Sequence, residues 1–271
     1  MQKKNHSNLW FYEKWLIKIL KTGHLPKHLA FIMDGNRRYA KDKNKPKAYG
    51  HEQGLNSLKK CLEWCLNLGI ETATVFAFAI ENFNREQSEI ETLFKLAKVN
   101  LYEMAQNNNF LQNNSIKVNI VGNLDLCPED VKKSMLDIMK LTEKNEKLNL
   151  NICFSYNSTY EMDHAFGTLK EEYEKGLIKL EDITPKMLND KFLIKGEPDM
   201  VIRTSNEIRL SNFLLYQSNN SELVFLKENW PDLSFWSFLK IILTFQMNEK
   251  SCKFYQKYFK EKEDGFLLTK Q

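Results

Sequence analysis

The sequence predicts one α/β domain in which a mostly parallel, six-stranded sheet is flanked by helices. Short apolar runs alternate with longer stretches of helical periodicity, which is the pattern of successive strand–helix units and of a parallel sheet. Most of these runs are apolar at nearly every position, as expected of strands that are buried on both faces. No internal repeat or low-complexity linker divides the 271 residues, so we expect a single domain.

The predicted strands are short apolar or β-branched runs. They are residues 29–33, 72–78, 116–121, 148–154, 200–202 and 223–226. The first of them, Leu29 to Met33, is continuously apolar and too short for a typical helix, so it is predicted to be a fully buried strand. It is followed by Asp34 and a polar segment rich in lysine, which we interpret as a cationic loop.

Helices are predicted where apolar residues recur with helical spacing. They are residues 52–68, 87–107, 128–144, 162–174 and 185–193. Apolar side chains line one side of the helix over 87–107, namely Ile90, Leu93, Phe94, Ala97, Leu101 and Met104. Such a stripe is either part of a filled core or one wall of an apolar tunnel, and the sequence leaves both interpretations open.

Residues 1–22 are predicted to form an N-terminal amphipathic helix, and residues 23–271 the domain itself. Leu9 to Leu20 is aromatic and basic, with Trp15, Leu16 and Ile19 at helical spacing. This helix either lies on a membrane surface or docks on its own domain. No apolar run has the length that spans a bilayer and no signal-peptide pattern opens the chain, so we expect a soluble protein.

The composition disfavours a nucleic-acid binder and a zinc site. The chain has 39 basic and 35 acidic side chains and a net charge of +4, a balance that disfavours a dedicated nucleic-acid binder. The lysines from Lys41 to Lys47 keep that class as an alternative. The 5 cysteines form no CxxC pair and are odd in number, which favours a reducing compartment and disfavours a zinc site.

Polar side chains follow three of the predicted strands. The segments are Asp34–Arg38, Glu81–Arg85 and Arg203–Ser211. A parallel sheet gathers such strand ends along one edge, where ligands bind. A carboxylate suits a divalent ion and arginines suit phosphate oxygens, so the set predicts a site for metal-bridged diphosphates. The glycine-rich loops of P-loop NTPases and dinucleotide enzymes are absent from the sequence.

Several long blocks of the sequence resemble the signature blocks of one enzyme family. The blocks Met33–Lys41, Gly50–His51, Phe78–Arg85 and Arg203–Leu215 closely resemble those of the cis-prenyltransferases, the undecaprenyl and dehydrodolichyl diphosphate synthases. Features similar to the eukaryotic dehydrodolichyl type are the DGNRR form, Trp64–Ile70, Phe235–Trp236 and Phe245–Asn248.

The resemblance implies a fold and an activity. The fold would be that of undecaprenyl diphosphate synthase, with an apolar tunnel. The activity would be repeated condensation of isopentenyl diphosphate onto an allylic diphosphate such as farnesyl diphosphate, with Mg²⁺, to give a long cis-polyprenyl diphosphate. Such a product is the precursor of a dolichol-type carrier lipid for protein glycosylation.

The resemblance also implies roles for individual residues. Asp34 and Asn82 would be catalytic, and Asp34 and Glu222 would bind metal. Substrate-binding residues would be Gly35, Asn36, Arg37, Arg38, Tyr39, Lys47, His51, Ala79, Glu81, Phe83, Arg85, Arg203, Arg209 and Ser211. In this assignment Arg203, Arg209 and Ser211 bind isopentenyl diphosphate.

Three positions depart from the family pattern. Asn206 replaces a glycine, so its loop needs a residue that tolerates the left-handed conformation. Ala79 replaces a common serine, and the tail ending at Gln271 lacks an RxG motif. The resemblance therefore implies a dimer, either a homodimer or a heterodimer with an RxG-bearing subunit, and keeps open a non-catalytic subunit of such a synthase. The expected location is the cytoplasmic face of the endoplasmic reticulum membrane or the cytoplasm.

Overall fold

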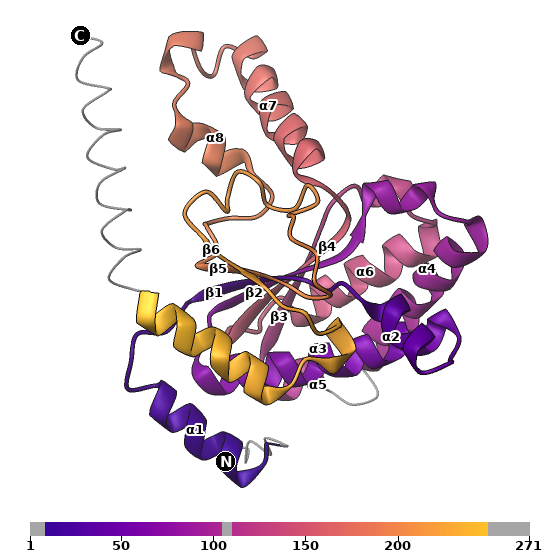
Figure 1. The fold of residues 1–271 in the computed structure, drawn as a ribbon. Coiled ribbons are helices and arrows are strands. Elements are labelled where there is room, and N and C mark those ends of the chain that lie inside the picture. The colour runs from indigo at the N-terminus through magenta and orange to yellow at the C-terminus, as the bar shows by residue number, and fades with distance from the viewer. Residues whose placement is uncertain (1–8, 105–109, 249–271) are drawn as a thin grey trace.

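The computed structural model describes residues 9–104 and 110–248, apart from the side chains of residues 100 and 101 (Figure 1). Parts of three predictions lie outside the described residues. They are positions 1–8 of the N-terminal helix, positions 105–107 of the helix over 87–107 together with the stripe residue Leu101, and the C-terminal tail without the RxG motif.

The predicted sheet is present, and the fold class is confirmed. The strands are β1 His28–Ile32, β2 Thr72–Ala79, β3 Ile116–Val121, β4 Leu148–Tyr156, β5 Met200–Arg203 and β6 Glu222–Phe225. They form one 6-stranded sheet in the order β3-β4-β2-β1-β5-β6. Every neighbouring pair is parallel, so the carboxyl ends of all the strands lie along the same edge.

Helices connect the strands. The α-helices are α1 Phe11–Leu20, α2 Asn36–Asp42, α3 Lys47–Leu68, α4 Gln87–Tyr102, α5 Phe110–Asn113, α6 Glu129–Thr142, α7 Ser158–Glu174 and α8 Pro185–Lys191. Short 3-10 helices are η1 Ile80–Asn84, η3 Leu124–Leu126, η4 Leu180–Asp182 and η5 Trp230–Asp232. A further helix, without a label in Figure 1, covers residues 235–248.

Three features of the helices differ from the prediction. Residues 36–42 form α2 rather than a cationic loop, and α3 begins at Lys47 rather than at residue 52. α7 also begins earlier than predicted, because the side chain of Asn157 caps it by accepting a hydrogen bond from the backbone N–H of Tyr160 at 2.8 Å. Both predicted starts were placed close to the first apolar residues of the helical pattern, whereas α3 begins at Lys47 and α7 at Ser158.

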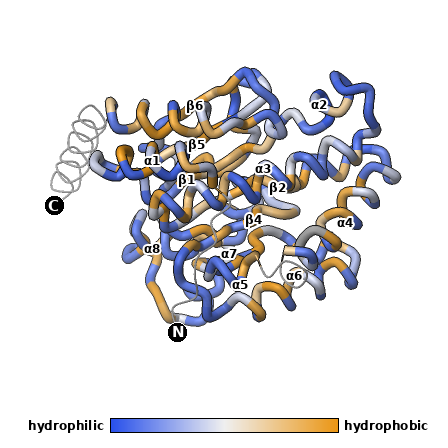
Figure 2. The backbone as a smooth tube through the Cα atoms, turned by 90° about the horizontal axis from the view of Figure 1, so that it is seen from below, coloured by the Kyte–Doolittle hydropathy of each residue, from blue (hydrophilic) through white to orange (hydrophobic). Residues whose placement is uncertain are grey.

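Hydrophobic cores lie on both faces of the sheet. The larger one packs α3, α4, α6 and the helix over 235–248 against one face. The smaller one lies on the other face, where Tyr156, Ile194, Phe213 and Leu214 pack on the strands. Figure 1 shows α7 and α8 on the opposite side of the sheet from α3 and α6, and Figure 2 shows the central strands as mainly hydrophobic.

A row of polar side chains crosses four adjacent strands. The Nε2 atom of His28 on β1 lies 2.7 Å from the hydroxyl of Thr74 on β2, which accepts a hydrogen bond of 3.0 Å from the amide of Asn151 on β4. The amide oxygen of Asn151 accepts a 3.0 Å hydrogen bond from Asn119 on β3. These contacts satisfy polar groups inside the sheet, where an unpaired one would be costly.

The buried histidine of this row predicts acid sensitivity. Burial lowers the pKa of His28 to about 4, against the raising influence of Asp199. Between pH 6.5 and about 4, the histidine is protonated in the unfolded chain but stays neutral in the folded chain. The free energy of unfolding therefore falls as the pH drops through this range. This shift contributes about 3 kcal/mol to the loss.

Urea unfolding between pH 7 and pH 4 checks this expectation. The free energy of unfolding of His28→Gln should fall by about 3 kcal/mol less than that of the wild type over this range. The exposed His164 gives a matched control, because His164→Gln should follow the wild-type curve. Parallel curves for wild type and His28→Gln would contradict the prediction.

The N-terminal helix packs on its own domain through one of its sides. Glu13, Ile17 and Leu20 are buried in α1. The ring of Tyr12 stacks on Trp236 with centroids 5.9 Å apart, and the amide of Gln246 donates a 2.8 Å hydrogen bond to the carbonyl of Leu20. Among residues 9–104 and 110–248, no helix has both the length and the apolar character to cross a bilayer.

Candidate functional site

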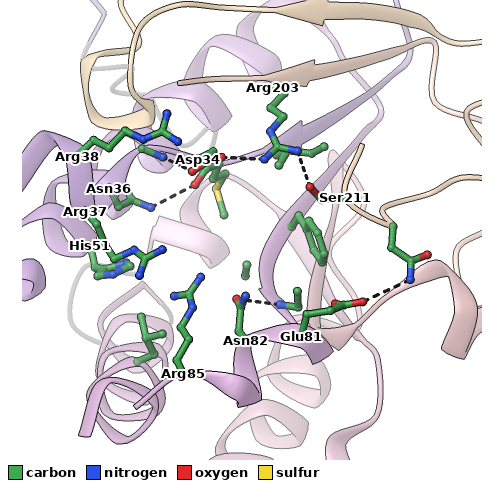
Figure 3. Close-up of a pocket in the computed structure, with 18 residues that line it drawn as sticks. Asp34, Asn36, Arg37, Arg38, His51, Glu81, Asn82, Arg85, Arg203 and Ser211 are labelled. Atoms are coloured by element: carbon green, nitrogen blue, oxygen red, sulfur yellow. Dashed lines mark hydrogen bonds and ion pairs between the residues drawn. The ribbon is translucent and has the colours of Figure 1, made fainter. Parts of the chain in front are cut away.

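The three polar segments predicted to converge do meet in the structure. They follow β1, β2 and β5, which are neighbours in the sheet, so Asp34, η1 and the loop after Arg203 share its carboxyl edge. A cavity of about 600 Å³ opens between them (Figure 3). Predicted site residues that line it are Asp34, Gly35, Asn36, Arg37, Arg38, His51, Ala79, Glu81, Asn82, Arg85, Arg203 and Ser211.

An ion pair lies at the centre of this cavity. The guanidinium of Arg203 donates from one nitrogen to the Oδ2 atom of Asp34 at 2.9 Å. Its other terminal nitrogen donates to the hydroxyl of Ser211 at 2.7 Å and to the carbonyl of Arg209 at 2.5 Å. The remaining carboxylate oxygen of Asp34 accepts the backbone N–H of Gly35 at 2.7 Å. Arg203 is 4% exposed, so this pair is held rigidly in place.

Glycines allow the segment after Asp34 to approach α3 and the loop at Asn229. Gly35 has φ +103°, and a Cβ there would lie 2.5 Å from the Oδ1 atom of Asn229. On α3, a Cβ on Gly50 would lie 1.9 Å from the carbonyl oxygen of Asn36, and one on Gly54 would lie 2.2 Å from its Oδ1 atom. Close packing of α2 on α3 therefore requires glycine at these positions.

The loop after β5 adopts the predicted backbone conformation. Asn206 has φ 58° and the preceding Ser205 has φ 75°, both in the left-handed region. Asparagine tolerates this region better than most residues, so the replacement of the family's glycine is accommodated. The loop is held by Arg38, which donates to the carbonyl of Ser205 at 2.5 Å and to its hydroxyl at 2.6 Å.

Three buried polar atoms on this cavity have no partner among the described residues. They are the Oδ1 atom of Asn36, the Nε2 atom of His51 and the Nε atom of Arg203. A buried polar group without a hydrogen bond costs free energy, and such groups gather where a ligand completes them. The three residues come from α2, α3 and β5, so one ligand in the cavity could reach groups from all three.

His51 is neutral at physiological pH. Burial, together with the nearby cations Arg85, Arg37 and Lys47, lowers its pKa to about 4 against the raising influence of Glu89. A neutral imidazole can donate one hydrogen bond and accept another, so His51 does not add to the positive charge of the site.

The cations of the site are paired with two further acids. Glu89 contacts Arg37, Lys47 and Arg85. Glu207 contacts Arg38 and Arg209 and has its pKa lowered by the hydrogen bond from Arg38. Neither acid was among the predicted site residues. Glu89 lies four positions after Arg85, a spacing that pairs side chains on a helix surface and was the available signal.

Some predicted substrate-binding residues lie outside the lining of the cavity. Tyr39 stacks on Tyr49 with centroids 6.2 Å apart, and Phe83 packs edge-on against Phe78. Lys47 reaches Glu89 at 2.9 Å, and the side chain of Arg209 is largely exposed and turned to Glu207. Asn82 lies on the lining but uses its amide oxygen to accept the backbone N–H of Ala79 at 3.2 Å.

Glu222 does not join Asp34 within one chain. It is the first residue of β6, whereas Asp34 follows the last residue of β1. Because the strands are parallel, Glu222 lies at the amino ends of the strands and Asp34 at their carboxyl ends. The prediction that Glu222 and Asp34 both bind metal therefore cannot describe one ion held by one chain. The Oε1 atom of Glu222 instead accepts a 2.8 Å hydrogen bond from Asn248.

The donors at this edge fit magnesium only in part. In the part of the chain that the structure describes, no three His, Cys, Asp or Glu side chains form a metal-binding group. Asp34 is the one carboxylate between Arg203 and Asn36 in Figure 3. Magnesium usually takes one or two carboxylates and completes its shell with substrate phosphates and water. Asp34 with a diphosphate would suit it.

An apolar pocket of about 150 Å³ adjoins the polar cavity. The two share Met33, Asn36, His51 and Leu93 among their lining residues. Leu93 and Ala97 of α4, and Met104 two residues after its end, form part of its wall, as members of the predicted stripe. Among the described residues this space is an apolar pocket, and the predicted tunnel is not shown.

Comparison with known proteins identifies a family whose model matches most of the chain. A family model with the description "Putative undecaprenyl diphosphate synthase" matches residues 32–253, which include all three polar segments. The chain is 42% identical over 249 residues, 91% of its length, to the dehydrodolichyl diphosphate synthase complex subunit DHDDS of Homo sapiens, of which it covers 74%.

Two other proteins are similar over most of the chain. The tritrans,polycis-undecaprenyl-diphosphate synthase (geranylgeranyl-diphosphate specific) of Thermococcus kodakarensis is 39% identical over 241 residues, which are 88% of this chain and 91% of that protein. The crystal structure of lavandulyl diphosphate synthase from Lavandula x intermedia in complex with dimethylallyl diphosphate has a TM-score of 0.75 and 25% identity. The two structures match over 82% of this chain and 95% of the lavandulyl diphosphate synthase chain.

Proposed function

The chain belongs to the undecaprenyl diphosphate synthase family of cis-prenyltransferases, and from that premise we propose how its own residues act. It elongates an allylic diphosphate with isopentenyl diphosphate into a long-chain polyprenyl diphosphate, a precursor of dolichol. The observation that carries this proposal is the meeting of Asp34, Asn36 and Arg203 beside an apolar pocket. A prenyl diphosphate has a charged diphosphate group and an apolar isoprenoid chain, so its binding needs a polar cavity next to an apolar pocket.

We assign the two diphosphates to the two sides of the Asp34–Arg203 pair. The allylic diphosphate would contact Gly35, Asn36, Arg37 and Arg38. Isopentenyl diphosphate would contact Arg203, Arg209 and Ser211. The buried Arg203 is already positioned by Asp34 and Ser211, so little side-chain ordering remains when substrate binds.

The chemistry is a prenyl transfer. The allylic C–O bond breaks and its electron pair leaves with the diphosphate, while the double bond of isopentenyl diphosphate forms a new C–C bond. Loss of a proton then forms the new double bond. Negative charge grows on the departing diphosphate, where the guanidiniums of Arg37 and Arg38 would stabilise it. Magnesium held by Asp34 and the diphosphate would supply further positive charge at that point.

The growing chain would extend into the apolar pocket along α4. The pocket of about 150 Å³ is too small for many isoprene units, so elongation requires it to widen. The wall that would move to widen the pocket contains Leu93, Ala97 and Met104. The apolar stripe predicted from the sequence would in that case serve as the tunnel wall.

A partner subunit fits the names of the relatives. The human relative is described as a subunit of a synthase complex. We propose that this chain also acts within a dimer, either with a second copy or with a different subunit. The alternative of a non-catalytic subunit has less support, because such a subunit does not need cations and a carboxylate gathered at one cavity.

The outer side of α1 would contact a membrane surface. Phe11, Trp15 and Ile19 recur every fourth residue and are 87%, 58% and 46% exposed. Lys14 and Lys18 are exposed beside them. Aromatic side chains next to lysines suit an anionic lipid interface, and a lipid product would be released there. The location at the endoplasmic reticulum is carried over from the resemblance to the dehydrodolichyl type.

Vesicle sedimentation tests this contact. Phe11→Ser with Trp15→Ser should weaken binding to phosphatidylserine-containing vesicles by at least about tenfold, because each aromatic side chain contributes ~1.5–3 kcal/mol when fully buried. Leu177→Ser with Leu180→Ser is the matched control, since both leucines are 70% exposed elsewhere. Equal binding of the two double variants would refute the assignment.

Product analysis tests the function itself. The purified chain is incubated with farnesyl diphosphate, labelled isopentenyl diphosphate and Mg²⁺, alone and with a candidate partner subunit. Labelled long-chain products from the chain alone support the full proposal. Products that appear only with the partner indicate an obligate heteromer, and a partner-dependent activity that survives Asp34→Asn would identify this chain as the non-catalytic subunit.

A further inference from the structure

All the cations of the proposed substrate site are paired with carboxylates of the described residues. Arg203 pairs with Asp34, while Arg38 and Arg209 pair with Glu207. The remaining three pair with a single acid, Glu89. Those three are Arg37, Lys47 and Arg85. Neither the predicted motif residues nor the proposed mechanism gives Glu89 a role.

Glu89 lies at a junction of four elements. It is in the first turn of α4, and its Oε1 atom lies 3.0 Å from Arg85 after η1 and 3.4 Å from Arg37 on α2. Its Oε2 atom lies 2.9 Å from Lys47, the first residue of α3. The Glu89 side chain is only 9% exposed, whereas those of Arg37 and Lys47 are 51% and 59% exposed. The carboxylate of Glu89 is therefore buried, whereas Arg37 and Lys47 extend from it toward solvent.

Glu89 remains ionised in this position. Burial, the largest single influence, raises its pKa, but Lys47, Arg37 and Arg85 together outweigh burial and hold the pKa below its ordinary value. A buried carboxylate shared by three cations thus offsets mutual repulsion among them. Arg37 and Arg85 also line the cavity, so the same side chains face both Glu89 and the substrate.

We propose that Glu89 is a positioning residue that acts as the resident counter-ion of the allylic diphosphate subsite. It holds Arg37 and Arg85 at the cavity, with Lys47 beside them outside the lining, and competes for these cations with the diphosphate. This inference rests on the proposed function. A prenyl transfer leaves inorganic pyrophosphate behind at every addition, so the subsite must release an anion as readily as it binds one. By competing for the same cations, Glu89 lowers the affinity of the subsite for pyrophosphate and so favours its release.

The proposal predicts a gain of affinity where a purely structural role predicts a loss. If Glu89 only held α4 in place, its removal would disorder the cations and weaken the binding of anions. If it is the competing counter-ion, its removal leaves one more positive charge unbalanced and strengthens binding. The sign of the change therefore separates the two roles.

The experiment compares Glu89→Gln with Glu91→Gln, using inorganic pyrophosphate as the probe. Glu91 is exposed on the same helix and bonds only Gln87 among the described residues, so both variants lose one charge at nearly the same place. Calorimetry should show about tenfold tighter pyrophosphate binding for Glu89→Gln, as expected for one unit charge acting on a multivalent anion at several ångströms. Its affinity should also fall more steeply with salt.

Glu91→Gln should bind pyrophosphate as the wild type does. Glu89→Asp keeps the charge on a shorter side chain and should lie between wild type and Glu89→Gln, which also covers the case that Glu89→Gln is poorly folded. Unchanged or weaker binding in both Glu89 variants would overturn the inference alone, provided that the wild type binds pyrophosphate and incorporates isopentenyl diphosphate. A wild type that does neither would overturn the proposed function and the inference with it.

Discussion

Asp34→Asn should reduce the incorporation of labelled isopentenyl diphosphate by about a thousandfold or more, since loss of one group that stabilises transition-state charge commonly costs 10²–10³ and Asp34 would also hold the metal. Asp34 now accepts the backbone N–H of Gly35 with one oxygen and the guanidinium of Arg203 with the other. Asparagine keeps one of these acceptors and turns an NH2 donor toward the other N–H group, so the melting temperature should also fall, although the chain should still fold. Thermal unfolding and the steady-state rate, measured on the same preparation, give both quantities.

A matched control comes from the same segment. Asp42 is exposed at the end of α2, so Asp42→Asn removes the same charge near the cavity without touching it and should leave turnover within about twofold. An Asp34→Asn variant that still incorporates isopentenyl diphosphate at the wild-type rate would disprove the assignment of Asp34 to the leaving diphosphate.

Arg203→Met should harm both stability and catalysis. The side chain is 4% exposed and bonds Asp34, Ser211 and the carbonyl of Arg209, so methionine would leave these groups without their donor. Removing one partner of a fully buried pair costs about 3–5 kcal/mol, and the loss here should be smaller because the Asp34 side chain is 32% exposed and water can reach it. Urea unfolding should show this loss, and the KM for isopentenyl diphosphate should rise more than that for the allylic substrate.

The neighbouring arginine separates these two effects. The Arg209 side chain is 61% exposed and contacts only Glu207 among the described residues. Arg209→Ala should therefore raise the KM for isopentenyl diphosphate while leaving the free energy of unfolding close to that of the wild type. A larger rise in the KM for the allylic diphosphate, in either variant, would reverse the assignment of the two subsites.

The sheet and the convergence of the site could be predicted because each depends on local sequence. A run such as Leu29 to Met33 is apolar at every position, and only a strand buried on both faces uses such a run. Once the strands are parallel, the residues that follow them must share one edge. Asp34 and Arg203 are therefore close in space although they are far apart in the sequence.

Other features depend on tertiary packing and could not be predicted. Residues 36–42 are too few and too polar to form a helix by themselves, and α2 packs closely against α3 because Gly50 and Gly54 leave room for it. Glu89 acquires its role from Arg37 and Lys47, which reach it from two other helices. The separation of Glu222 from Asp34 follows from strand direction, which a motif match does not contain.

The docking of α1 sets an order on biosynthesis. Tyr12 stacks on Trp236, and the carbonyl of Leu20 accepts a hydrogen bond from Gln246, so this helix leaves the ribosome well before these two partners. At ~5–20 residues per second, a separation of 224 residues amounts to a wait of roughly 10 to 45 s. During translation the part of α1 that Trp236 and Gln246 cover is therefore available to chaperones or to a nearby bilayer until these two residues have been made.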